Sequence, residues 1–208
     1  MFYPEFKRRD EVFYHSNRKE FYASYHANYK YILEDCLERC AYCDITVNEN
    51  GGDAMHLDHF RPQRYFGMLK THPYNLYLCC PKCNGLKKDD WPALKIADQP
   101  SYVGAVGYLD RFQANPSEFL TVGEDGKITP LAHPIGYMVK KLQLNRSSRV
   151  NVRRKRQLEA RKEILLEGIT VLMAKIDSDL KSGRILRDQA LSKFQSVSSM
   201  MIAFRALR

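Results

Sequence analysis

The sequence predicts an α+β protein in which a small metal-stabilised core lies between helical segments. Two Cys-x-x-Cys pairs bracket a stretch rich in turn residues, and apolar residues recur at helical spacing on either side of it. With 208 residues, 44% of them hydrophobic, the chain can bury a core. We divide it into four segments: 1–39 (N-terminal, helical), 40–92 (metal core), 93–139 (irregular, with a β-hairpin) and 140–208 (basic, helical).

One amphipathic helix is predicted in the N-terminal segment, from about Ser16 to Arg39. Apolar and aromatic side chains recur there at helical spacing, and Ser16 or Asn17 could cap its start.

Four cysteines have the spacing of a structural zinc site: Cys40, Cys43, Cys80 and Cys83. A two-residue spacer lets both thiolates of a pair reach one tetrahedral metal, and two pairs complete its shell. We therefore expect Zn²⁺ to stabilise the fold there. Cys36 and Cys79 have the wrong spacing and are expected to be core thiols. Clustered cysteine pairs, together with an N-terminus that lacks an apolar export signal, favour a cytoplasmic protein with no membrane segment.

The residues between the two cysteine pairs include candidates for hydrolytic chemistry. Cleavage of a phosphodiester near neutral pH needs a base to activate water and a hard divalent cation held by oxygen ligands. Asp58 and Asn84 offer such oxygens for Mg²⁺ or Mn²⁺, and His59 offers an imidazole that can accept a proton. His56 lies two residues from Asp58, on the same face of a predicted short strand, so its role stays open between structural and auxiliary.

These motifs resemble the HNH endonuclease family in its zinc-supported form, over about residues 40–90. They are Cys-x-x-Cys, Asp-His-Phe-Arg-Pro beginning at Asp58, and Cys-x-x-Cys-Asn ending at Asn84, with a lysine three residues on. The resemblance implies a ββα-metal core, His59 as general base, and Asp58 and Asn84 as ligands of one Mg²⁺ or Mn²⁺. It also implies that Asn75 holds the catalytic loop and orients the histidine. The family often has histidine where this chain has Asn84.

Beyond the core, the sequence predicts a β-hairpin and two helices. The hairpin spans residues 119–129, where Glu-Asp-Gly supplies the turn. A long helix ends near Gly183, and a second helix follows. Their apolar stripes are expected to pack against each other or to dock on a partner protein: Leu158, Leu165, Ile169, Leu172, Ile176 and Leu180 on the first helix, and Leu191, Phe194, Val197, Met201, Phe204 and Leu207 on the second.

Basic residues are concentrated at the C-terminal end. The chain has a formal net charge of +9, and residues 140–208 hold 17 Lys and Arg against 6 Asp and Glu. Such a face suits a polyanion, expected to be DNA, although a solvated helix surface is the alternative. The candidate contacts are Arg61, Lys87, Lys88, Arg146, Arg149, Arg153 and Arg154. A zinc-stabilised nucleic-acid-binding module without catalysis would also explain the cysteines and the charge.

A narrower similarity covers about residues 36–155. The chain resembles the HNH subunits of anti-phage systems that pair a nuclease with an ATPase, such as Septu and related retron systems. The motifs that carry it include Asn84-Gly-Leu-Lys-Lys-Asp-Asp-Trp-Pro and Lys141-Leu-Gln-Leu-Asn-Arg. This similarity implies an effector nuclease controlled by an ATPase partner, with the terminal helices as candidate docking elements.

Overall fold

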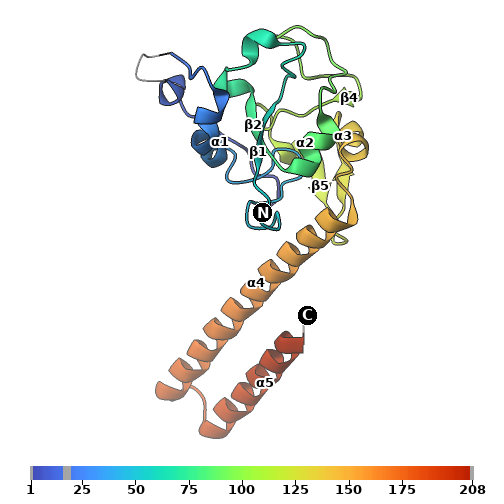
Figure 1. Cartoon of the computed structure of the whole chain (residues 1–208). Helices are drawn as coiled ribbons and strands as arrows, with labels where there is room; N and C mark the ends of the chain where they lie inside the picture. Colours follow the sequence, from blue (N-terminus) through green and yellow to red (C-terminus); the bar gives the residue numbers. More distant parts are fainter. Residues whose placement is uncertain (1, 16–19, 207–208) are drawn as a thin grey trace. The chain divides into compact units, whose positions relative to one another are not determined.

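The computed structural model of the protein (Figure 1) describes residues 2–15 and 20–206. The chain forms two compact units, Met1–Arg153 and Arg154–Arg208. This division falls inside one long helix. It lies later in the chain than the boundary at residue 140 that the sequence predicted from the increase in basic residues. In the described part of the chain, no helix combines the length and the apolar character that crossing a membrane requires.

The N-terminal segment is less helical than predicted. It contains two short 3-10 helices, η1 (Glu11–Tyr14) and η2 (Tyr25–Asn28), and η2 leads directly into the α-helix α1 (Tyr29–Asp35). The single helix predicted from Ser16 to Arg39 is therefore wrong in length. The candidate caps Ser16 and Asn17 lie outside the described residues.

Helix α1 ends early because the next backbone turns left-handed. Leu37 and Glu38 have φ values of 52° and 55°. Their amides donate to the carbonyl oxygens of Glu34 and Leu33 at 2.8 Å each, which is the bonding of a Schellman motif. Glycine usually occupies the first of these positions, so the leucine there gives no sequence signal for the stop.

Two antiparallel strands and a helix form the centre of the first unit. Strand β1 (His56–His59) pairs with β2 (Leu76–Cys79), and Asp58 lies opposite Tyr77. Helix α2 (Pro81–Lys87) follows β2 and contacts β1, while α1 contacts β2. All residues of β2 are buried. The predicted short strand that carries His56 and Asp58 is confirmed.

Short elements surround this centre. They are η3 (Gly67–Leu69), η4 (Pro73–Asn75), β3 (Tyr102–Val103), β4 (Val106–Gly107), η5 (Pro116–Glu118), β5 (Leu120–Val122), β6 (Ile128–Pro130) and α3 (Ile135–Lys141). Strands β5 and β6 form the predicted antiparallel hairpin. In the hairpin of β3 and β4, a Cβ at Gly107 would lie 2.4 Å from Tyr102 Cα, so only glycine fits there.

An aromatic core joins the residues after α2 to the strands. Phe60 stacks on Tyr77 with ring centroids 4.5 Å apart. Trp91 meets the edges of Phe60 and Phe66 and lies parallel to Tyr108. These rings bury large apolar areas together, so the extension after residue 92 belongs to the same core as the metal-binding segment.

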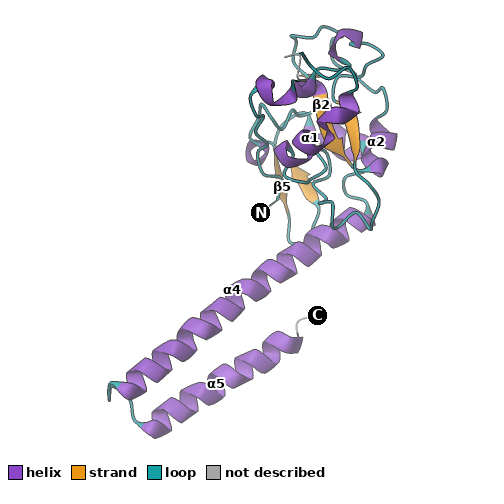
Figure 2. Ribbon diagram, turned by 60° about the vertical axis from the view of Figure 1, so that its left-hand side comes forward, coloured by secondary structure: helices purple, strands orange, loops and turns teal. Residues whose placement is uncertain are grey.

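The second unit is a pair of helices. Helix α4 (Ser147–Lys181) enters this unit at Arg154, and α5 (Arg187–Ala206) runs beside it (Figure 2). The turn between them contains Gly183 at a φ of 71°, as predicted for the end of the first helix.

The predicted apolar stripes are only partly buried. The core of the helix pair consists of Ile169, Ile176, Ala190 and Val197. Leu165, Leu172 and Leu191 are exposed, whereas Ala190, which the stripes did not include, is buried. Two helices in contact cover only a narrow strip of each other, so a small residue at the contact line can displace a larger neighbour from it. Leu207 lies outside the described residues.

Candidate active site and metal centre

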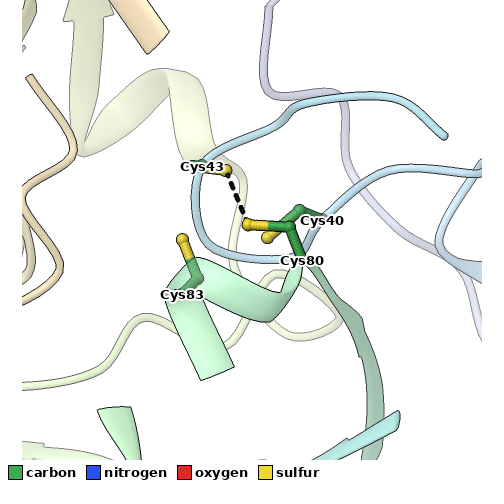
Figure 3. Close-up of side chains that lie close together, drawn as sticks. All are labelled: Cys40, Cys43, Cys80 and Cys83. Carbon is green, nitrogen blue, oxygen red and sulfur yellow. Dashed lines mark hydrogen bonds between the residues drawn. The ribbon is translucent and has the colours of Figure 1, made fainter. Parts of the chain in front are cut away.

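The four cysteines of the two pairs meet in one buried cluster (Figure 3). Their Sγ atoms lie within 4.8 Å of one another, and those of Cys43 and Cys80 are 3.7 Å apart. A tetrahedral Zn²⁺ with Zn–S bonds of about 2.3 Å would place its sulfur ligands about 3.8 Å apart. The cluster therefore has the size and donor set of a closed four-thiolate site, which leaves no ligand position for water.

Backbone hydrogen bonds fix the two cysteine pairs on the central strands. The amide of Ala41 donates to the Leu78 carbonyl oxygen at 2.8 Å, which ties the first pair to β2. The amide of Asp44 donates to the carbonyl oxygen of Cys40 at 3.0 Å and closes the turn. In the second pair, Cys80 occupies the N-cap position of α2 and Cys83 lies within that helix.

Two of the arginines predicted to contact nucleic acid, Arg146 and Arg149, contact the sulfur cluster. Arg149 places Nε 3.3 Å from Cys43 Sγ and Nη2 3.5 Å from Cys80 Sγ. Arg146 places Nη2 3.7 Å from Cys83 Sγ. Burial lowers the pKa of Arg149, but interactions with Cys43 and Cys80 outweigh burial and raise the pKa overall.

Arg153, another predicted contact, is unavailable to nucleic acid because its side chain is buried. Its Nε donates to the Gly126 carbonyl oxygen at 2.6 Å, and its Nη2 donates to the Leu144 carbonyl oxygen at 2.8 Å. Arg153 thus fixes the turn of the hairpin to the start of α4. Arg154, the next residue, is exposed and belongs to the second unit.

Asp58 lies on the buried face of β1 and forms an ion pair with Lys87. The Nζ atom of Lys87 is 3.0 Å from Asp58 Oδ2 and 2.9 Å from the carbonyl oxygen of His59. The Tyr42 hydroxyl donates to Asp58 Oδ2. Burial and the Asp58 charge raise the pKa of Tyr42 well above its usual value, so this hydroxyl stays a donor. The predicted phosphate contact of Lys87 is wrong, because Lys87 is fully buried.

His59 follows Asp58 and points to the other face of β1. Its Nε2 atom is 2.8 Å from the carbonyl oxygen of Lys70, and its ring meets that of Tyr25 edge-on at 4.7 Å. A carbonyl oxygen only accepts, so Nε2 carries the proton of the neutral ring. The remaining nitrogen, Nδ1, is then the basic one.

Asn75 binds the backbone of the segment after β1. Its Oδ1 accepts from the amide of Arg61 at 2.8 Å, and its Nδ2 donates to the Arg61 carbonyl oxygen at 3.0 Å and to that of Leu69 at 3.3 Å. Asn75 is buried at the end of η4, where the chain enters β2. It therefore closes a loop that starts immediately after His59.

Asn84 and His56 contact each other through Asn84 Nδ2 and His56 Nδ1 at 3.3 Å. If the amide nitrogen donates to that ring, the amide oxygen of Asn84 is left as an acceptor. A polar pocket of about 220 Å³ brings Asp58, His59 and Asn84 together, whereas Asn75 lines a separate cavity. The polar pocket is lined by Tyr25, Leu57, Asp58, His59, Pro62, Gln63, Asn84, Lys88 and Asp89.

Arg61 does not line this pocket. It borders a separate cavity of about 640 Å³, donates to the Gln99 carbonyl oxygen at 2.7 Å and lies over the Trp91 ring. Among the seven basic residues proposed from the sequence, only Lys88 lines the pocket of His59.

Sequence reasoning missed Tyr42, Tyr25 and the carbonyl oxygen of Lys70, which contact Asp58 or His59. Tyr42 lies between Cys40 and Cys43. The available signal was this position, because one metal held by both cysteine pairs brings the first pair close to the rest of the metal core. Nothing in the sequence distinguishes Tyr25 or Lys70 from their neighbours.

Comparison with known proteins supports the resemblance seen in the motifs. Residues 40–90 match the family model for the HNH endonuclease, and the sulfur cluster, Asp58, His59, Asn75 and Asn84 all lie within the matched segment. No curated protein and no solved structure matches the chain. The match covers about a quarter of the chain. At the level of the family, it indicates a metal-dependent nuclease whose substrate is nucleic acid.

Proposed function

We propose that this protein is a metal-dependent HNH endonuclease of the ββα-metal type, which hydrolyses phosphodiester bonds in DNA and leaves 5′-phosphate ends. The observation that carries the proposal is the pocket lined by Asp58, His59 and Asn84, within the segment that matches the HNH model. It combines a positioned imidazole, oxygen donors and a cation, which are the parts that phosphodiester hydrolysis requires.

His59 acts as the general base through Nδ1. Because Nε2 donates to the Lys70 carbonyl oxygen, the ring is held in one tautomer and one orientation. Nδ1 then takes a proton from the attacking water, and the hydrogen bond at Nε2 stabilises the imidazolium that results. Asn75 supports this geometry because it fixes the loop that begins at Arg61.

Asp58 and Asn84 would hold the catalytic Mg²⁺ or Mn²⁺. A carboxylate and an amide oxygen are hard donors that suit these ions, and their shared pocket leaves room for water. When bound, the ion supplies positive charge to the phosphate in the transition state. Lys87 and Tyr42 hold Asp58 in place, while His56 holds the amide of Asn84. Lys88, exposed at the pocket, adds charge that attracts the phosphate backbone.

The test is cleavage of plasmid DNA by the purified, zinc-loaded protein with Mg²⁺ or Mn²⁺. We expect EDTA to stop nicking and His59→Ala to slow it by about 100-fold or more, while His133→Ala, at an exposed histidine outside the pocket, keeps full activity. Normal cleavage by His59→Ala would remove the base assignment. A folded wild-type protein that binds DNA in a salt-sensitive way but cuts no nucleic acid would support the non-catalytic binding module.

We also propose, from the motif resemblance over residues 36–155, that the nuclease is the effector of an anti-phage system with an ATPase partner. The exposed apolar side chains of α4 and α5, among them Ile164, Val171 and Ile202, offer contacts for such a partner. Co-purification of the chain with the ATPase, lost on deletion of residues 154–208, is expected. A cleavage rate that the ATPase leaves unchanged would argue against control by a partner.

A further inference from the structure

Two arginines that lie outside the HNH match direct their guanidinium groups at the sulfur cluster. Arg146 comes just before α4, and Arg149 lies in its first turn. Together they reach three of the four cysteine sulfurs, at 3.3 Å to Cys43, 3.5 Å to Cys80 and 3.7 Å to Cys83. Both contacts form within the first unit, so they do not depend on the placement of the second.

The charge of the sulfur cluster explains why cations belong there. Four thiolates and one Zn²⁺ leave a formal charge of about −2. All four cysteines are buried, and a buried charge without a partner is costly. The two guanidinium groups supply two positive charges at the edge of the cluster. In addition, their N–H groups can donate hydrogen bonds to thiolate sulfurs that water does not reach in a closed site.

We propose that Arg146 and Arg149 are outer-sphere partners of the zinc centre, and that the bound metal thereby holds the start of α4 on the first unit. This role replaces the phosphate contact that the sequence suggested for both residues. The inference needs zinc at the four cysteines but does not rest on the proposed nuclease activity.

The neighbouring contacts show what the metal would hold in place. Arg153 ties the same segment to the hairpin turn through the Gly126 carbonyl oxygen, and Asn145 bonds the backbone of Ile128 in both directions. The segment 145–153 is thus fixed on one side by the hairpin and on the other by the sulfur cluster. Loss of the metal removes the second attachment and leaves the first.

The first test measures zinc affinity by competition with a chelating dye, on the full chain. We expect Arg149→Gln and Arg146→Gln to raise the zinc dissociation constant by about 10- to 100-fold, the usual effect of losing an outer-sphere partner. Arg154→Gln is the matched control: it removes the same charge from an exposed position five residues along the same helix and should leave the constant unchanged. Arg149→Lys, which keeps the charge, should recover most of the affinity.

Zinc constants that agree within twofold for all these variants would overturn the proposal. So would weaker DNA binding by Arg149→Gln at full zinc occupancy and unchanged zinc affinity, because that result returns the residue to a phosphate-binding role. If Arg149→Gln does not fold even in excess zinc, Arg146→Gln and Arg149→Lys decide the question in the same assay.

The second test needs no substitution. Trypsin cleaves after arginine, so the wild-type chain carries its own reporters at Arg146 and Arg149. We expect a zinc chelator to accelerate cleavage at these two sites first, and cleavage at Arg9, which pairs with Glu34 and Asp35 instead of with the cysteine pairs, only later, when loss of zinc unfolds the first unit. Simultaneous exposure of all three sites would contradict the local attachment of α4.

Discussion

The sulfur cluster and the pocket of His59 are built from neighbouring residues of the chain, but the cluster is closed to water and the pocket is open to it. Cys83 and Asn84 are consecutive residues of α2, yet Cys83 is buried in a closed shell and Asn84 lines an open polar pocket. A closed thiolate shell suits a metal that stabilises a fold, whereas an open site with oxygen donors suits a metal that must meet a substrate. In the proposed function, the same short helix therefore contributes to a structural site and to a catalytic one.

Substitution of a cysteine is expected to have the largest effect and to distinguish the two sites most clearly. Cys83→Ser removes a ligand from the closed shell and should abolish cooperative folding, since structural zinc contributes on the order of 10 kcal/mol to small domains. Thermal unfolding followed by circular dichroism, with zinc content measured in parallel, checks this. The control is Cys79→Ala, a buried cysteine outside the cluster, which should retain zinc and unfold cooperatively. Similar losses in both variants would show that the damage comes from packing alone.

Lys87→Met tests the buried pair that supports the open site. It leaves the Asp58 carboxylate buried without its cation and should lower the free energy of unfolding by about 3–5 kcal/mol in urea titration. Lys88→Met, at the exposed neighbour, should change it by less than about 0.5 kcal/mol. The double variant Asp58→Asn/Lys87→Met should recover much of the loss. If it is as unstable as Lys87→Met alone, the ion pair is not the cause.

Asn84→Ala should affect the catalytic metal and spare the zinc. We expect the Mg²⁺ concentration for half-maximal cleavage to rise by about tenfold or more, with zinc content and unfolding temperature unchanged. Lys82→Ala, on an exposed position of the same helix, serves as the control. A loss of zinc in Asn84→Ala would mean that the two sites are not separable.

The smallest effect concerns nucleic-acid affinity. Arg154→Gln should reduce the slope of log affinity against log salt by about one, as expected for one lost phosphate contact. Fluorescence anisotropy with labelled DNA over a range of salt concentrations measures the slope. Arg153→Lys is the control. It changes a buried arginine and keeps the positive charge, so it is expected to leave the slope unchanged. An unchanged slope for Arg154→Gln would assign this surface to a protein partner or to solvent.

Local spacing carried the predictions that the structure confirms. Cys-x-x-Cys pairs bring their sulfurs together by geometry alone, and the turn residues of the hairpin specify its position. Period-two alternation in β1 also separates the side chains of Asp58 and His59, as their different proposed roles require.

Tertiary context decided the rest. Lys87 and Lys88 are adjacent and chemically identical, yet Lys87, the last residue of α2, is buried against Asp58, whereas Lys88 follows the helix at a φ of 47° and is exposed. Arg146 and Arg149 belong to the most basic part of the sequence, and only the packing of α4 beside the cysteines shows that their charge meets sulfur. Net charge indicated a polyanion but could not distinguish an internal anion from an external one.

Asn84 directly follows the predicted zinc ligand Cys83 in α2, so the direction of its side chain is set by the rotation of the helix from that ligand. Each residue of an α-helix turns the next by about 100°. A single residue inserted between Cys83 and Asn84 would leave the sulfur cluster intact but swing the amide away from His56 and the pocket of His59. Such a protein would keep its four cysteines, but it would lose the oxygen donor proposed for the second metal and would turn Lys87 away from Asp58, so both the pocket and the buried ion pair fix the spacing between Cys83 and Asn84.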